Sequence, residues 1–218
     1  MKGHLYFLLS EPVEGATPTP LPHAIAAQTI EASLWSAEEK AHLRAHTAYL
    51  SWTFSLEPDP IEAFIEAYRQ ATQFSSLVGI ANPLASTAHT SKWAYRLFED
   101  GLEAVARQTP PLHLWTGLKP FYVEPTWEAL VAGQPTSLWL RTVGYSQFGV
   151  PELAHPLQDL RETGWIHSLF ELLFDWMYFG GKVLQPGDAI EVPERGRYLV
   201  KSFSPELLAL LEYREAPA

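Results

Sequence analysis

Three side chains that can transfer protons stand close to two turn sequences in the second half of the chain: Glu152, His155 and Asp188. Carboxylates and imidazole act as general acids and bases because protein surroundings can bring their pKa values close to neutrality. If these groups converged on a pocket beside the turn around Gly149, they would supply the acid–base pair of a small-molecule hydrolase. They are the candidate catalytic residues.

Other catalytic signatures are absent or out of register. The stretch GYSQFG puts Ser146 one position too early for the GxSxG motif of serine hydrolases. His42 and His46 stand four apart, but Leu43 follows the first histidine where a zinc protease of this spacing has glutamate. The sequence has no phosphate-binding glycine loop, and the lack of cysteine excludes thiolate catalysis, disulfides and iron–sulfur clusters. We therefore predict neither a cofactor nor a metal site.

Charge and hydropathy argue against two further classes of protein. The chain of 218 residues has 15 lysines and arginines against 25 aspartates and glutamates, a formal net charge of −10. Binding to nucleic acid or to an anionic membrane needs a basic surface. The apolar run Leu5–Leu9 is too short for the core of a signal peptide, and no window reaches the roughly 18 apolar residues of a membrane span. We expect a cytoplasmic protein that binds neither nucleic acid nor membrane.

The stretch RTVGYSQFGVPEL, residues 141–153, combines turn residues with aromatic and polar side chains. Gly149 followed by Val150 and Pro151 predicts a tight hairpin turn, and Gly144 predicts a bulge in the preceding strand. These backbone requirements account for the glycines and the proline. The other side chains of the region can contact a ligand or a partner, and the candidates are Trp139, Tyr145, Gln147 and Phe148.

Local signals predict the elements of the first half. The run His4–Leu9 is typical of a strand buried on both faces, and residues 47–55 alternate as a strand with one buried face does. Asp59 followed by Pro60 and Glu62 predicts an N-capped helix with a capping box. The remaining predicted elements are helices over 23–34 and 90–108 and a buried strand over 75–81.

The second half predicts a ferredoxin-like β-α-β-β-α-β order over residues 112–202. The predicted strands cover 112–118, 137–147 and 150–157, with a final hairpin of 189–193 and 197–202, and the predicted helices cover 124–133 and 165–181. The fold class is therefore α+β, with a mixed, mostly antiparallel sheet and helices packed on it. We expect one compact unit over 1–218, with a soft division into 1–110 and 111–218 as the alternative.

Two segments of the second half resemble a known family. VGYSQFGVPELA, with Gly144, Tyr145, Phe148, Gly149 and Glu152, is followed after a helix by FGGKVLQPGDAIEV, with Gly180, Gly181, Gly187 and Asp188. Together they are similar to the C-terminal part of a bacterial family catalogued as domain of unknown function number 4261. The resemblance extends over 46–202, including the weaker HTAYLSW, and is specific over 144–190. It implies a shared α+β fold and no activity.

Three functions are compatible with the sequence. The first is a non-enzymatic protein-binding or regulatory factor of immunity type, because catalytic motifs are missing and large aromatics such as Trp115, Trp127 and Trp139 are abundant. The alternative is a hydrolase that uses Glu152, His155 or Asp188. The third is self-association through the apolar helix 165–179, so the expected partner is another protein or a second copy.

Overall fold

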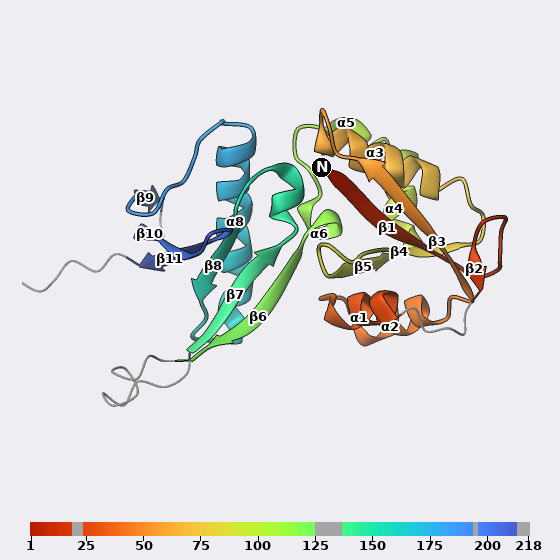
Figure 1. The fold of residues 1–218 in the computed structure, drawn as a ribbon, viewed down its shortest axis with the longest axis horizontal. Coiled ribbons are helices and arrows are strands. Elements are labelled where there is room, and N and C mark those ends of the chain that lie inside the picture. The colour runs from red at the N-terminus through yellow and green to blue at the C-terminus, as the bar shows by residue number, and fades with distance from the viewer. Residues whose placement is uncertain (19–23, 125–136, 194–195, 213–218) are drawn as a thin grey trace, which may run out of the picture. The chain divides into compact units, whose positions relative to one another are not determined.

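The computed structural model describes the chain except residues 19–23, 125–136, 194–195 and 213–218 (Figure 1). Its contacts divide the chain into two units, Met1–Gly117 and Leu118–Ala218. The fold is α+β with mostly antiparallel sheets, as predicted. The helix predicted over 124–133 falls almost wholly outside the described residues.

The first unit is built on a five-stranded sheet with β1 (Lys2–Leu9) at its centre. This strand pairs antiparallel with β3 (Ala48–Ser55) and with β4 (Leu77–Asn82). The edges are β2 (Thr17–Pro18) and β5 (Thr87–Thr90), which gives the order β2-β3-β1-β4-β5. The alternating strand predicted over 47–55 is β3, and the buried strand predicted over 75–81 is β4.

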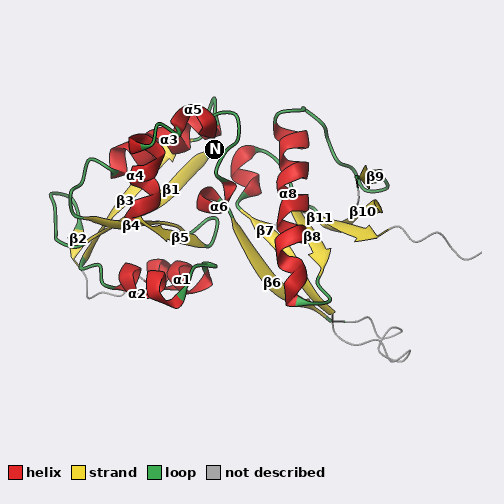
Figure 2. Ribbon diagram, turned by 180° about the vertical axis from the view of Figure 1, so that it is seen from behind, coloured by secondary structure: helices red, strands yellow, loops and turns green. Residues whose placement is uncertain are grey.

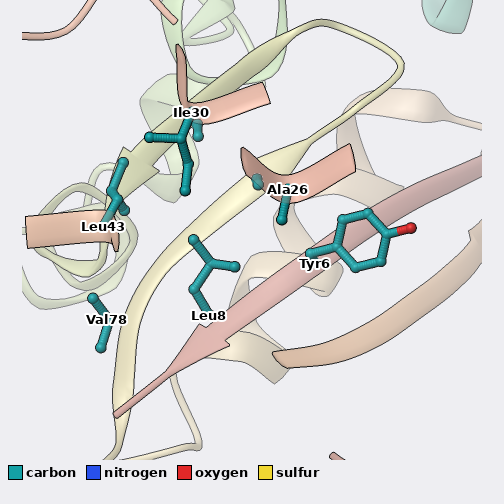
Figure 3. Packing of buried hydrophobic residues seen from close by; sticks show 8 residues of the cluster. Tyr6, Leu8, Ala26, Ile30, Leu43 and Val78 are labelled. Atoms are coloured by element: carbon teal, nitrogen blue, oxygen red, sulfur yellow. The ribbon is translucent and has the colours of Figure 1, made fainter. Parts of the chain in front are cut away.

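Helices cover both faces of this sheet (Figures 1 and 2). On one face, α1 (Ala24–Ala32) and α2 (Ala37–Arg44) close a core that contains Tyr6 and Leu8 of β1 (Figure 3). On the other face Phe7 packs against Trp52 and Phe74 beside α3 (Pro60–Ala71) and α4 (Ser91–Glu99). The prediction that β1 is buried on both faces is confirmed.

The start of α3 follows the predicted pattern in part. The Oδ1 atom of Asp59 accepts hydrogen bonds from the amides of Ile61 at 2.9 Å and of Glu62 at 3.4 Å. The carboxylate of Glu62, expected to complete a capping box, instead binds the guanidinium of Arg107. The N-cap is therefore Asp59 alone, and Glu62 ties α3 to the segment after α5 (Glu103–Ala106).

Two predicted boundaries in the first unit are wrong. The helix predicted over 90–108 is interrupted between α4 and α5, where Gly101 has a positive φ of 66° that a continuous helix cannot contain. The strand predicted over 112–118 begins as a short helix, α6 (Leu112–Trp115). One helical turn there buries Leu112, Leu114 and Trp115 together, which strand alternation would not do.

The second unit contains a six-stranded sheet in the order β6-β7-β8-β11-β10-β9. Its helix α8 (Thr163–Tyr178) lies across one face (Figure 2). The strands are β6 (Gly117–Val123), β7 (Ser137–Val143), β8 (Glu152–Pro156), β9 (Ala189–Val192), β10 (Gly196–Ser204) and β11 (Leu207–Glu212).

The ferredoxin-like order of this unit is not confirmed in detail. Three strands follow α8 instead of the predicted two, because β11 was not predicted. This strand pairs antiparallel with β10 and parallel with β8, so it lies between them in the interior of the sheet. The insertion separates β8 from the hairpin of β9 and β10.

Candidate functional site

The connection between β7 and β8 is longer than the tight turn predicted from sequence. Strand β7 ends at Val143, and residues Tyr145–Phe148 form a 3₁₀ helix. Gly144 and Gly149 flank this helix with φ of 105° and 75°, a backbone conformation that favours glycine. Gly144 therefore marks the end of β7 and the start of the helical turn, where a bulge within the strand was predicted.

Glu152 uses its carboxylate to hold this turn in place. One oxygen, Oε1, accepts from the amides of Gly144 at 2.9 Å and Ser146 at 3.1 Å and from the Ser146 hydroxyl at 3.1 Å. The other, Oε2, accepts from the Thr142 hydroxyl at 2.7 Å. Both oxygens are engaged, so this candidate catalytic residue has a positioning role in the turn.

Three of the candidate contact residues are buried beneath the same turn. The rings of Tyr145 and Phe148 pack edge-on against Phe174 of α8, and burial raises the pKa of Tyr145 far above its ordinary value. The side-chain amide of Gln147 donates to the Gly144 carbonyl at 3.3 Å. Tyr145 and Phe148 thus attach the turn to α8, and all three side chains are buried and present little surface to a partner.

His155 and Asp188 also have structural surroundings. The His155 ring is buried between Trp165 and Tyr198, its Nδ1 atom is hydrogen-bonded to the Pro156 carbonyl, and burial lowers its pKa. Its Nε2 atom has no hydrogen-bond partner among the described residues. Asp188 is exposed and accepts from the Gln185 amide at 2.7 Å, which closes the turn before β9.

The hollow beside the β7–β8 turn does not bring the candidate catalytic groups together. It has a volume of about 470 Å³, and Gly149, Val150 and Pro151 form part of its wall. Its polar side chains are Lys182, Ser202 and Ser204. Glu152, His155 and Asp188 do not line it.

The aromatic residues named from sequence have different environments. Trp115 is fully buried, and Trp127 lies outside the described residues. Trp139 is half-buried and lies against Phe121 and Phe203, with ring centroids 6.3 and 5.5 Å away. Trp139 is thus the one predicted contact residue that keeps part of its side chain at the surface.

A groove between α8 and β9 exposes apolar side chains of the second unit. Its volume is about 430 Å³. Leu172 and Trp176 in its wall and the adjacent Phe179 are 49%, 42% and 47% exposed. The full set of lining residues is Leu172, Leu173, Asp175, Trp176, Gly180, Ile190, Glu191 and Val192.

The sequence of α8 explains why apolar groups face outward there. Leu172, Trp176 and Phe179 follow one another at spacings of four and three, so they form one stripe on the helix. A second stripe, which includes Phe170 and Phe174, is buried against the sheet. A helix that is apolar on both sides has more apolar surface than its own sheet can cover. Sequence reasoning recognised the apolar helix 165–179 but could not tell which side stays open.

The groove carries negative charge. Asp175 and Glu191 line it, and the described lining residues include no lysine, arginine or histidine, although Arg197 stands opposite Glu191 in the neighbouring strand. Partial burial raises the pKa of Asp175 above its ordinary value.

The first unit contains a buried tyrosine–histidine pair whose pKa values are both strongly shifted. The Tyr68 hydroxyl lies 2.6 Å from Nε2 of His89, and Nδ1 of His89 lies 3.1 Å from the Thr90 carbonyl. A carbonyl can only accept, so Nδ1 carries the proton and Nε2 accepts from Tyr68. Burial lowers the pKa of His89 to about 4, against the smaller opposing effect of the Thr90 carbonyl. Both side chains are buried, so the pair is part of the core of the first unit.

The described residues contain no group of three or more His, Cys, Asp or Glu placed to hold a metal ion. Helix α2 ends at Arg44, before His46, whose Nδ1 atom is hydrogen-bonded to the Leu43 carbonyl at 2.6 Å. Within the same residues, no helix is long and apolar enough to cross a membrane.

Comparisons of the chain with protein-family models and with curated proteins found no match.

Proposed function

We propose that the chain is a non-enzymatic, cytoplasmic regulatory protein of immunity type that binds a partner protein through the groove between α8 and β9. The observation that carries the proposal is the stripe of Leu172, Trp176 and Phe179, each more than two-fifths exposed beside a hollow of about 430 Å³. Large aromatic and aliphatic side chains in this arrangement are typical of the centre of a protein interface.

The exposed stripe gives a partner substantial binding energy. Covering a fully exposed side chain of this size stabilises a complex by about 1.5–3 kcal/mol, so three half-exposed ones offer about 2–4 kcal/mol together. Tryptophan is among the residues that most often dominate such interfaces. The rest of the affinity has to come from polar and backbone contacts around the groove.

The hydrolase alternative has less support. Its three candidate groups are engaged elsewhere: Glu152 holds the β7–β8 turn, Asp188 closes the turn before β9, and His155 is buried. A general base has to reach its proton directly or through one water, and the hollow beside the turn contains none of the three.

We also keep the resemblance to domain of unknown function 4261 as a proposal for the second unit. Its support is that Gly149 and Gly187 of the two shared segments have positive φ, a reason for glycine at these positions in any chain with the same turns. The resemblance adds no activity.

Partner capture with matched variants tests the proposed function. The full chain, Trp176→Ser and Leu160→Ser would be immobilised in parallel, because Leu160 is an exposed leucine of the same unit that does not line the groove. We expect a protein that is retained by the wild type and by Leu160→Ser and lost from Trp176→Ser. Equal retention by all three would contradict the proposal.

A further inference from the structure

Strand β9 forms an open edge of the six-stranded sheet beside the apolar groove. Within the described part of the chain it pairs with β10 alone and ends the strand order. The amide of Val200 donates to the carbonyl of Asp188 at 2.8 Å, and Tyr198 stands opposite Ile190. In an antiparallel ladder the bonded residues alternate, so Ile190 and Val192 direct their N–H and C=O groups toward β10. The N–H and C=O groups of Ala189 and Glu191 therefore point away from the sheet.

We infer that the occupant of the groove is an extended peptide segment that adds to β9 as a further strand and carries lysine or arginine. This inference rests on the proposed function and specifies its partner. Backbone hydrogen bonds to Ala189 and Glu191 supply the alignment, and alternate apolar side chains enter the groove beside Trp176. Strand addition to a sheet edge with adjacent side-chain pockets is a recurrent way of binding peptides.

The apolar groove beside β9 distinguishes this sheet edge from edges that are only shielded against pairing. Natural proteins shield open edges with short strands, charges and proline, and β9 has four residues, with Glu191 in the strand and Pro193 after it. Such shielding opposes uncontrolled pairing with apolar strands. It does not oppose a strand that carries its own positive charge, because Asp175 lines the groove, and Trp176 and Leu172 give that strand an apolar contact.

Charge complementarity selects the class of segment. Among the described residues that line the groove, Asp175 and Glu191 are the ionisable ones. Arg197 stands opposite Glu191 in the β9–β10 ladder, so Asp175 is the acid that a basic segment would meet. A second copy of this chain is a poorer occupant, because it brings another net charge of −10. Two β9 strands paired across a dimer would also place two copies of Glu191 close together. A basic, alternating segment has neither disadvantage.

Selection from a peptide library tests the inference with the full chain. A random twelve-residue library displayed on phage would be selected on the wild type and counter-selected on Trp176→Ser. We expect the recovered peptides to alternate apolar and polar residues and to contain lysine or arginine. Recovery of peptides with helical spacing, of acidic peptides, or of none that depends on Trp176 would overturn the inference.

Two variants of β9 and a charge variant then test the binding mode on the best recovered peptide. Ala189→Pro removes the outward N–H group and leaves the bonds to β10, whereas Ala189→Ser keeps that group. We expect Ala189→Pro to weaken binding about threefold to tenfold, the loss of one hydrogen bond, and Ala189→Ser to leave it unchanged. Asp175→Asn should weaken it about twofold to fivefold, as the loss of one exposed ion pair does.

The outcomes separate the inference from the proposed function. A native partner that depends on Trp176 but binds Ala189→Pro and Ala189→Ser equally would overturn strand addition and leave the proposed function intact. A partner indifferent to Trp176 would overturn both. A chain that forms dimers at physiological ionic strength, sensitive to Trp176→Ser in light scattering, would identify a second copy as the occupant and overturn the inference.

Discussion

Glu152 shows how one side chain can organise a turn. Its carboxylate accepts four hydrogen bonds from Thr142, Gly144 and Ser146. These contacts join the end of β7 to the start of β8, and they fix the 3₁₀ helix that buries Tyr145 and Phe148. A carboxylate that accepts from backbone amides forms stronger bonds than a neutral acceptor.

Replacement of Glu152 should therefore cost stability. We expect Glu152→Ala to lower the free energy of unfolding by about 3 kcal/mol, and Glu152→Gln by about 1 kcal/mol because one acceptor oxygen remains. Urea denaturation of the full chain measures both. Glu206→Ala, which removes an exposed carboxylate of the same unit, is the control and should change stability little. An effect of Glu152→Ala as small as the control's would show that the turn does not depend on these bonds.

His89 should give the first unit a pH-dependent stability. Its pKa is about 4 in the fold and about 6.5 in the unfolded chain. As the pH falls, the unfolded state takes up the proton first, so stability is complete above about pH 6.5 and decreases down to about pH 4. The decrease due to this residue is about 3 kcal/mol.

Nitrogen-15 NMR of the histidine rings measures the titration of His89 directly. We expect the ring to remain neutral, with the proton on Nδ1, from pH 8 down to pH 5. The exposed His42 serves as an internal comparison in the same spectra. A midpoint for His89 close to that of an exposed histidine would contradict the burial argument.

At the scale of elements, α8 has a packed side and an open side. Phe174 is buried against the turn residues Tyr145 and Phe148, whereas Trp176 two positions later is partly exposed. The two aromatics belong to the same helix and differ only in the face on which they lie. Their contributions to stability should differ accordingly.

Alanine substitution separates the two sides of α8. We expect Phe174→Ala to lower the free energy of unfolding by about 3–5 kcal/mol, because it leaves a cavity in the core. Trp176→Ala should lower it by about 1–2 kcal/mol, because only the buried part of this side chain stabilises the fold. Thermal and urea denaturation measure the difference. A comparable loss for both variants would mean that Trp176 supports the fold, which would weaken its assignment to a binding surface.

Elements with a complete local signal were predictable from sequence. Residues 47–55 alternate, and Asp59-Pro60 marks a helix start, so β3 and α3 follow from neighbours in the chain. The apolar run of β11 has no such signal, because a short run suits a strand or a helix, and its partner β8 lies about 50 residues earlier. The run forms a strand because it pairs with segments that are distant in the sequence.

The candidate site was less predictable than the fold. Sequence identified Glu152 and the apolar helix 165–179 but not their roles. Whether the Glu152 carboxylate faces a substrate or accepts hydrogen bonds from backbone amides depends on the conformation of the β7–β8 connection. Whether Trp176 is core or surface depends on how wide a face of α8 the sheet covers. Both are properties of the tertiary structure.

At the scale of the whole molecule, charge opposes self-association while the apolar groove favours it. The formal net charge of −10 makes copies of the chain repel one another at low ionic strength. Salt screens that repulsion and leaves apolar contacts in place. Ionic strength should therefore control whether two copies of the chain associate through the groove.

We expect a single chain in solution at physiological ionic strength, and a rise in mass only at molar salt. Light scattering across a salt series measures the mass. Trp176→Ser should remove the rise, and Leu160→Ser should retain it. A dimer already present at low salt would contradict the charge argument.

The interior position of β11 has a consequence for the order in which the second unit is made. β6, β7 and β8 can pair with one another early in synthesis, and so can β9 and β10. The two groups share no boundary in the finished sheet, because β11 separates them. The sheet thus cannot close until residues 207–212 have been synthesised, and until then the flanking edges of β8 and β10 stay open to other chains.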